Sequence, residues 1–349
     1  MKWLHWLMPL VLLASTAHAE DAPSVIRLGA PALQGDTQGV WGATGVARAK
    51  GWFEEEFAKD GIRFEFPGFK GGGPMVGQAL ANGQIDFAGN GDMISLIGRS
   101  SGIKSRLLIP GSRLENAYLL VAPGSAIHSV KDLRGKKVAY FKGNYIQLQV
   151  IRILATEGMT EQDIRNVSLV GAAATHALLS GNVDAIFAGA ESLESQDKGL
   201  TQVVYSTQGK PARLTAQSGI LVREDFAQRY PDITRRVVKV LVKAAHWASE
   251  PANKDELFAI WAKGGRSLQT LEQDYAGRPI ADRVSPLLDP FFVAQYQDTE
   301  HLVDTLGLLR GGTFDVQQWF APRYLDAALK ELGLEHYWVP LGADGQRSP

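Results

Sequence analysis

Glycine followed by a helix start recurs in this 349-residue chain where predicted strands end. Such a junction leaves backbone N–H groups unpaired and turns the positive end of a helix dipole toward one side of the sheet. One such junction is also an ordinary helix cap, whereas several aimed at one point would bind an anion. The junctions are Gly73-Pro74, Gly91-Asp92-Met93, Gly143-Asn144-Tyr145 and the segment from Gly171 to Thr175. The pattern therefore predicts a small-anion site built from helix beginnings.

Four polar side chains lie at or near these junctions. Asn144 and Thr175 could add hydrogen-bond donors to the anion site. Asp92 and Glu191 stand at matching strand ends, where a carboxylate either accepts from a ligand amine or caps the next helix. For Asp92 we expect the capping role.

A repeat about a hundred residues apart organises these junctions. Residues 79–89, ALANGQIDFAG, are echoed by ALLSGNVDAIFAG from residue 177, and the offset of 98 residues also pairs Gly73 with Gly171. Helix, polar-Gly turn, aliphatic-Asp, strand and glycine thus occur twice, which predicts two similar α/β lobes with a ligand held between them. The alternative is coincidence, because this turn is common. Asp86 and Asp184 are expected to bond nearby backbone N–H groups, outside the site.

Periodicity and turn residues place the remaining elements. A strand at 25–29 leads into a polar loop at 31–39, which contains Gln34 and should line the same cleft, and a helix follows at 40–59. Its aromatic residues are expected in the core, except Trp41 at the loop edge. Further strands are predicted at 85–88, 105–109, 117–122, 137–141, 167–170, 183–187, 202–205 and 218–222, and helices at 74–81, 93–99, 145–157, 171–179, 230–247, 254–263, 290–306 and 320–332.

These elements predict a two-lobed chain. We expect residues 20–118 plus 215–349 in lobe 1, 119–214 in lobe 2, and hinge crossings near 118–124 and 210–218. The tail from Leu341 is small and polar, and we expect it to fray.

Composition and charge exclude several classes of function and of binding site. A net charge of −1 gives no basic surface for nucleic acid. Residues 1–19, with Lys2, an apolar run and Ala17-His18-Ala19, predict a signal peptide and export to the periplasm. The absence of cysteine excludes disulfides and thiolate sites, and the seven histidines lack metal-ligand spacing. We expect neither metal nor cofactor.

The chain resembles the periplasmic solute-binding proteins of sulfonate, taurine and nitrate ABC importers, of the type II, Venus-flytrap class. The resemblance covers about residues 25–247. Its carriers are AKGWF at 49–53, Gly61, residues 79–91, 129–140 with Lys142-Gly143, 180–184, and LVREDFAQRYP at 221–231. It implies a two-lobed α/β fold with hinge strands and, here, a helical C-terminal extension from about Gly264.

The resemblance also implies site positions. The ligand's acidic group would lie at Gly91-Asp92-Met93 and Gly143-Asn144-Tyr145, with further contacts at Gly189-Ala190-Glu191. Met93, Asn144 and Ala190-Glu191 depart from the family's usual residues, so the ligand's identity stays open. On this basis Asn144→Ala should weaken binding while leaving unliganded stability nearly unchanged.

The leading hypothesis is a non-enzymatic, monomeric binding protein that captures an aliphatic sulfonate, taurine or a sulfate ester and presents it to an inner-membrane permease. Nitrate or a pyrimidine precursor is an alternative ligand. The rival class is an enzyme resembling desulfinases or thiamine-pyrimidine synthases, whose catalytic residues, notably cysteine, are missing here. A periplasmic sensor or scaffold is a third interpretation.

Overall fold

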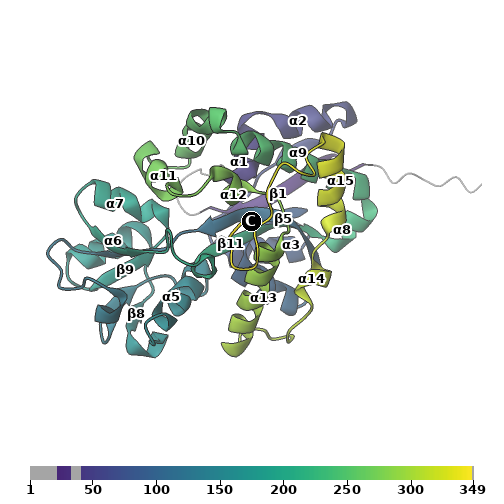
Figure 1. Cartoon of the computed structure of the whole chain (residues 1–349). Coiled ribbons are helices and arrows are strands. Elements are labelled where there is room, and N and C mark those ends of the chain that lie inside the picture. Colours follow the sequence, from purple (N-terminus) through teal and green to yellow (C-terminus); the bar gives the residue numbers. More distant parts are fainter. Residues whose placement is uncertain (1–21, 33–40, 348–349) are drawn as a thin grey trace, which may run out of the picture.

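The computed structural model describes residues 22–32 and 41–347, which form two β-sheets with helices packed around them (Figure 1). The first sheet has the order β2-β1-β4-β11-β5, with β3 also pairing with β1, and the second has the order β10-β6-β9-β7-β8. Their strands are β1 (Val25–Pro31), β2 (Arg63–Glu65), β3 (Gly68–Phe69), β4 (Phe87–Gly91), β5 (Ser105–Glu115), β6 (Tyr118–Val121), β7 (Lys137–Ala139), β8 (Arg165–Val167), β9 (Ala185–Ala188), β10 (Gln202–Ser206) and β11 (Ala216–Arg223). The signal-peptide prediction and Gln34 lie outside the described residues.

The two sheets have the same topology, which confirms the predicted repeat. In the first, β1 is parallel to β2 and β4, and β11 runs antiparallel to β4 and β5. In the second, β7 is parallel to β8 and β9, and β6 runs antiparallel to β9 and β10. The repeated strands β4 and β9 therefore occupy the same central position in each sheet.

Asp86 and Asp184 have the same role in both sheets. The Asp86 carboxylate accepts from the Arg27 backbone N–H at 2.9 Å, and the Asp184 carboxylate accepts from the Lys137 N–H at 2.7 Å. Each aspartate N–H in turn donates to the carbonyl of the same partner. The predicted structural role is correct, but the bonds join neighbouring strands and not the local turn. Each pair of hydrogen bonds between an aspartate and a backbone thus holds the start of a central strand, β4 or β9, against its neighbour in the sheet.

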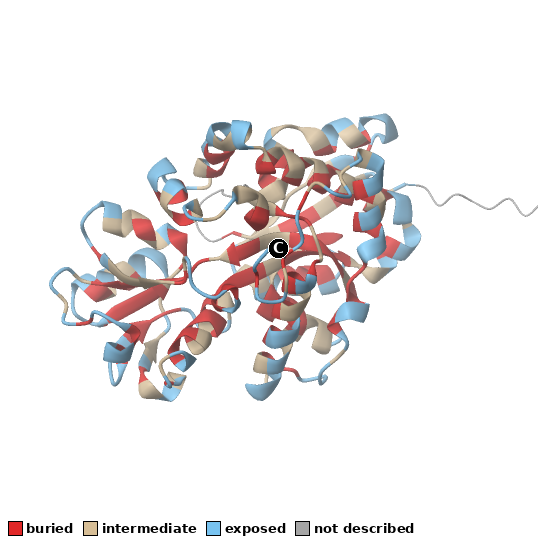
Figure 2. Ribbon diagram, viewed as in Figure 1, coloured by how far each residue is buried: buried red, intermediate tan, exposed pale blue. Residues whose placement is uncertain are grey.

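The helix predicted over 40–59 is two helices, α1 (Gly42–Ala49) and α2 (Trp52–Phe57). Gly51 between them has φ +69°, a left-handed conformation that an α-helix cannot contain. The break turns Phe53 and Phe57 into the first core, where both are fully buried. The long helix α9 (Pro231–Ser249) covers this core from the other side. Buried residues run through both sheets in Figure 2.

Four of the other helices before the C-terminal part agree closely with prediction: α3 (Gly72–Ala81), α4 (Asp92–Ser100), α5 (Tyr145–Ala155) and α6 (Gly171–Leu179). The helices α7 (Leu193–Asp197) and α8 (Glu224–Arg229) were not predicted. Short 3-10 turns include η2 (Val130–Leu133) and η4 (Ala190–Ser192). The predicted strand at 167–170 is instead β8, at Arg165–Val167, because Val170 already precedes α6.

The helix predicted at 254–263 is α10 (Lys254–Ala262). Among the described residues, the C-terminal extension from about Gly264 contains five helices: α11 (Leu268–Tyr275), α12 (Ile280–Val284), α13 (Pro290–Thr305), α14 (Val316–Trp319) and α15 (Pro322–Leu332). Of these, α11, α12 and α14 were not predicted. The tail from Leu341 was expected to fray, but up to Arg347 it packs against the rest of the protein, so this expectation is wrong. Leu341 is 1% exposed and its N–H donates to the Asp289 carboxylate, and the Gly345 carbonyl accepts from Arg278.

Two chain crossings connect the sheets, and they are bonded to each other. Between β5 and β6, the Ala117 N–H donates to the Thr207 hydroxyl at 3.0 Å. The Thr207 N–H, just after β10, donates back to the Ala117 carbonyl at 3.0 Å. The two-lobed fold with strand crossings is the one predicted. The lobe boundaries at 118/119 and 214/215 stay a prediction.

Candidate functional site

Arg266 joins the two lobes at the predicted site. It lies in the connection between α10 and α11, and its guanidinium carbon is 4.2 Å from the centre of the Trp41 ring, at the start of α1. One of its nitrogens, Nη2, is 4.0 Å from Oε2 of Glu191, in η4 after β9. Arg266 thus contacts an aromatic ring and a carboxylate with one guanidinium. Two predicted site residues from different lobes are therefore brought together by an arginine that sequence reasoning missed.

Tyr145 and Glu115 complete this group. A Cβ atom built on Gly189 would lie 3.3 Å from the Tyr145 hydroxyl and 2.6 Å from Oε2 of Glu191, so both side chains approach the Gly189 backbone closely. Glu115 ends β5 at the crossing between the lobes, and its side chain is 27% exposed. We call Trp41, Glu115, Tyr145, Glu191 and Arg266 the interlobe cluster.

The members of the interlobe cluster act on each other electrostatically. Burial raises the pKa of the Tyr145 hydroxyl, and the Glu191 and Glu115 carboxylates raise it further. Burial also raises the pKa of Glu115, while Arg283 and Arg266 oppose that rise. For Arg266 itself, burial lowers the pKa but the two glutamates outweigh it, so the guanidinium stays charged.

Three polar groups of the cluster lack hydrogen bonds. Within residues 22–32 and 41–347, the structure gives none to the Arg266 guanidinium, the Tyr145 hydroxyl or the Glu115 carboxylate. Partly buried polar groups are normally paired, because an unpaired one loses its interaction with water without compensation. A polar ligand at this position would supply the partners.

The glycine junctions are arranged differently from the prediction. The Gly91 N–H donates to the Asn90 side chain at 3.1 Å, the Gly143 N–H to Oε1 of Gln147 at 2.8 Å, and the Gly189 N–H to Oε1 of Glu191 at 3.2 Å. These amides, which the sequence interpretation had aimed at the anion, already have intramolecular acceptors. The cation of the interlobe cluster is Arg266, which comes from outside these junctions.

Asn144 begins α5, and its Oδ1 accepts from the Ile146 N–H at 3.0 Å. It is thus an N-cap, which leaves its amide NH₂ as the part able to reach a ligand. Thr175 donates to the Gly171 carbonyl within α6. The Ala190 side chain is 4% exposed and packs in the core of the second lobe.

The contacts of Asp92 and Met93 are with residues outside the interlobe cluster. Asp92 is 1% exposed; its Oδ1 accepts from the Met93 N–H at 2.7 Å and its Oδ2 from the Thr299 hydroxyl at 3.1 Å. Burial raises the pKa of Asp92, and Arg152 opposes the rise. The Met93 side chain packs with Leu148 and other apolar residues of α5 and α13. These positions hold helices together, which agrees with the capping role expected for Asp92.

Small, partly exposed residues lie at the ends of the central strands of the first lobe. Ser218 of β11 pairs with Gly91 of β4 and with Ser112 of β5, and the two serine hydroxyls are 2.8 Å apart. A Cβ on Gly42 would lie 2.8 Å from the Gly111 carbonyl, so the start of α1, beside Trp41, packs close to this edge. The edge could contribute hydroxyl groups to a ligand near Trp41.

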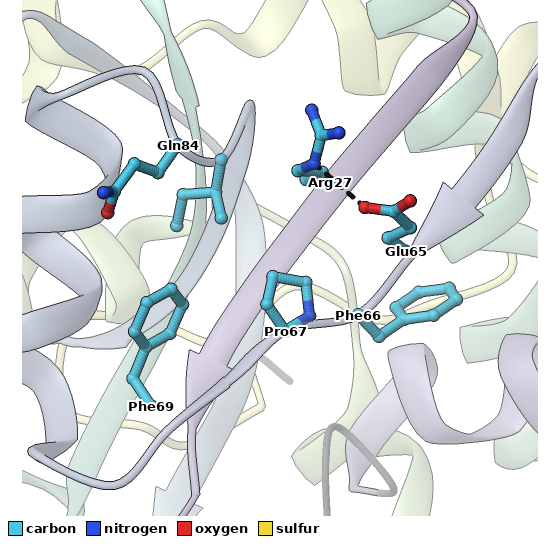
Figure 3. A pocket seen from close by; sticks show the side chains of 7 residues that line it. Arg27, Glu65, Phe66, Pro67, Phe69 and Gln84 are labelled. Atoms are coloured by element: carbon cyan, nitrogen blue, oxygen red, sulfur yellow. Dashed lines mark hydrogen bonds and ion pairs between the residues drawn. The ribbon is translucent and has the colours of Figure 1, made fainter.

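A cavity of about 510 Å³ lies elsewhere (Figure 3). It is an open depression beside β1, β2 and β3, where Arg27 and Glu65 form an ion pair at 2.9 Å. Its lining residues are Arg27, Glu65, Phe66, Pro67, Phe69, Gln84 and Ile85, and it shares none with the predicted site. Size alone therefore does not identify the binding site here.

Neither a metal-ligand cluster nor a helix able to span a membrane occurs among the described residues. No cluster of three or more His, Cys, Asp or Glu side chains in the described part could hold a metal ion. Among the helices of residues 22–32 and 41–347, none has the length and apolar character to cross a membrane.

Residues 42–254 match a family model described as NMT1/THI5 like. The chain belongs to the NMT1/THI5-like family. A solved structure of the periplasmic sulfonate-binding protein SsuA from Methylobacillus flagellatus KT is 30% identical, covers 93% of this chain and 98% of its own, and superposes with a TM-score of 0.82. The family and fold suggested by the sequence are confirmed.

Sequence relatives are consistent with this membership. A Bacillus subtilis (strain 168) protein assigned to aliphatic sulfonate binding is 32% identical over 208 residues, which are 59% of this chain and 61% of the relative. This family member therefore spans less than two thirds of that relative in the alignment. The desulfurization enzyme DSZB has the same fold, with a TM-score of 0.70 and 18% sequence identity. The superposition covers 89% of this chain and 100% of DSZB. A shared fold at that identity does not indicate a shared activity.

Proposed function

We propose that this protein is the periplasmic substrate-binding component of an ABC importer and that it captures a small organic sulfonate between its lobes. Membership of the family and the names of its relatives support the class. The observation that carries the site assignment is Arg266, held between Trp41 of one lobe and Glu191 of the other.

The geometry suits such a ligand. A guanidinium presents several N–H donors in one plane, which match two oxygens of a sulfonate or sulfate ester. The Trp41 ring offers an apolar face for a short alkyl chain. Because the contacts come from both lobes, the ligand favours the closed arrangement over the open one. A permease in the inner membrane would then receive the closed, monomeric form.

Isothermal titration of the purified protein tests the proposal. The panel is alkanesulfonates, 2-aminoethanesulfonate (taurine), sulfate esters, nitrate and pyrimidine precursors. We expect binding of at least one sulfonate, and Arg266→Gln should weaken it more than about tenfold, as loss of a charge-assisted hydrogen bond does. Arg165→Gln, at an exposed position on β8, is the control and should bind as the wild type does.

Two results would overturn the proposal. One is binding of nitrate or a pyrimidine precursor with no response to any sulfonate or sulfate ester. The other is release of sulfite or another product from the bound compound, followed by mass spectrometry, which would establish an enzyme.

A further inference from the structure

Helix α5 of the second lobe has two apolar faces. One packs in the core of its own lobe, where Ile153 and Leu154 are fully buried. The other carries Leu148 and Ile151, which pack with α4 and α13, two helices that also pack on the first sheet. A helix at the surface of a lobe needs only one apolar face, so the second face indicates a contact with the first lobe. We give the name α5–α13 seam to this apolar cluster, which consists of Met93, Ile97, Leu148, Ile151, Leu302, Val303, Leu308 and Leu309.

Hydrogen bonds join the same three helices beside the α5–α13 seam. Nη2 of Arg152 in α5 donates to the Thr299 hydroxyl of α13 at 2.8 Å, and this hydroxyl donates to the Asp92 carboxylate of α4 at 3.1 Å. Nε of Arg152 also donates to the Asp298 carboxylate at 3.0 Å. The contact between the lobes is therefore both apolar and hydrogen-bonded here.

The helix α5 is also bonded to both chain crossings. The side chain of Gln149 is fully buried, and its Nε2 donates to the Glu115 carbonyl at 2.9 Å and to the Leu214 carbonyl at 3.2 Å. Glu115 ends β5 before the first crossing, and Leu214 ends the 3-10 turn η5 (Ala212–Leu214) just before β11. Because the lobes are connected through these crossings, α5 lies where a rotation between them must be centred.

The contacts between α7 and α11 are of another kind. There the Ser267 N–H donates to Glu194, and the Gln269 side chain donates to Asp197, and both hydrogen bonds are exposed. Water replaces exposed hydrogen bonds at little cost, whereas separating the α5–α13 seam would bring its apolar side chains into water. Figure 1 shows α5 and α13 on one side of the connection between the lobes, and α7 and α11 on the other. The α7–α11 side is therefore the easier one to open.

We propose that the lobes open on one side only, with the α5–α13 seam closed as the pivot and the gap forming between α7 and α11. This motion uncovers the interlobe cluster, because Arg266 directly precedes α11 and Glu191 lies just before α7. The C-terminal extension then has two roles, since α13 holds the pivot and α11 closes the entrance. The pivot does not depend on which ligand the protein binds.

Pairs of spin labels measure the two sides separately by double electron–electron resonance. The natural chain contains no cysteine, so labels attach only where one is introduced. The seam pair joins the end of α5 to α13, and the entrance pair joins the residue after α7 to the residue after α10. All four positions are exposed: Ala155→Cys with Gln297→Cys for the seam, and Lys198→Cys with Lys263→Cys for the entrance.

The unliganded protein is compared with the variant that carries Glu194→Ala and Gln269→Ala, which removes the α7–α11 hydrogen bonds. In both proteins the entrance pair should reach distances longer than in this structure, and the seam pair should keep the distance it has here. An entrance pair that keeps its distance in both proteins, or a seam pair that lengthens as much as the entrance pair, would overturn the proposal. No ligand is used, so failure of the proposed function would not affect the result.

Two leucines of α5 test whether the α5–α13 seam, and not stability in general, holds the pivot. Leu148 lies in the seam and Leu154 in the core of the second lobe, and they are 1% and 0% exposed. Both Leu→Ala substitutions leave a cavity and should lower the midpoint of urea unfolding. Only Leu148→Ala should broaden the distances of the seam pair. Equal broadening in both variants, or none in either, would show that apolar packing in the seam does not hold the pivot.

Discussion

At the scale of single residues, the candidate site depends on two charged residues, Arg266 and Glu115, that no local sequence pattern identifies. Arg266 follows Gly264-Gly265 in a helix connection, and Glu115 ends an apolar strand. Neither belongs to a motif, and Arg266 lies outside the region that carries the family resemblance. The glycine pair before Arg266 was the one available signal, since glycine often marks a turn that aims the next side chain. Trp41, Tyr145 and Glu191 were predicted because they adjoin strand ends.

Glu115 predicts a pH dependence of binding. Because burial raises its pKa, Glu115 takes up its proton at a higher pH than an ordinary glutamate, although Arg283 and Arg266 oppose this and Asp274 and Glu191 add to it. Once protonated, Glu115 no longer offsets the positive charge of Arg266. The affinity for an alkanesulfonate should therefore rise on acidification, beginning above the usual carboxyl range near pH 4. Titrations across this range in wild type and Glu115→Gln check it; the variant should show a flatter profile, and parallel profiles would contradict the assignment.

At the scale of elements, the start of α5 has a structural role that the sequence interpretation did not separate from binding. Asn144 and Gln147 satisfy the Ile146 and Gly143 amides, so the helix begins with its own side chains as acceptors. Gln147 is in turn bonded to Glu161 at 3.0 Å, which ties the turn to the next segment of the second lobe. The beginning of α5 is therefore fixed by hydrogen bonds within the second lobe, and it places Tyr145 beside Gly189.

The N-cap changes what we expect of Asn144→Ala. Removing an N-cap acceptor costs about 1 kcal/mol, so the unliganded variant should be less stable by about that amount, contrary to the expectation of nearly unchanged stability. Urea unfolding of the unliganded protein measures this. Asn144→Ser retains a capping oxygen and should recover most of the loss. Wild-type stability in Asn144→Ala would show that the cap contributes nothing.

At the scale of the whole molecule, the C-terminal extension contacts the second lobe at two places. On one side the Ser267 N–H donates to Glu194 at 3.0 Å, and the Gln269 side chain donates to Asp197 at 2.9 Å, which ties α11 to α7 of the second lobe (Figure 1). On the other side Arg152 of α5 bonds Asp298 and Thr299 of α13. The segment that carries Arg266 is thus held by the ties of α11.

The ties of α11 should influence opening of the lobes. Glu194→Ala combined with Gln269→Ala removes two exposed hydrogen-bonded contacts, and we expect the free energy of unfolding to change by less than about 1 kcal/mol. The unliganded protein should become more open and its radius of gyration in small-angle X-ray scattering should increase, because these contacts exist only when the lobes are close. Glu55→Ala, which breaks an exposed ion pair within the first lobe, is the control. Identical scattering from the double variant and the control would show that α11 does not restrain the lobes.

The sequence by itself determined the repeated α/β unit, the central strands, the main helices and the family, because these depend on apolar periodicity and on glycine at local turns. The sequence did not predict the helix break at Gly51 or the buried position of Leu341, because both depend on how segments pack against one another. The tertiary structure alone decided which charges meet. Arg266 reaches Trp41 and Glu191, residues far away along the chain, only because α10 and α11 fold back over the crossing between the lobes. No local pattern encodes such a contact, since it arises from the packing of elements that are themselves specified independently.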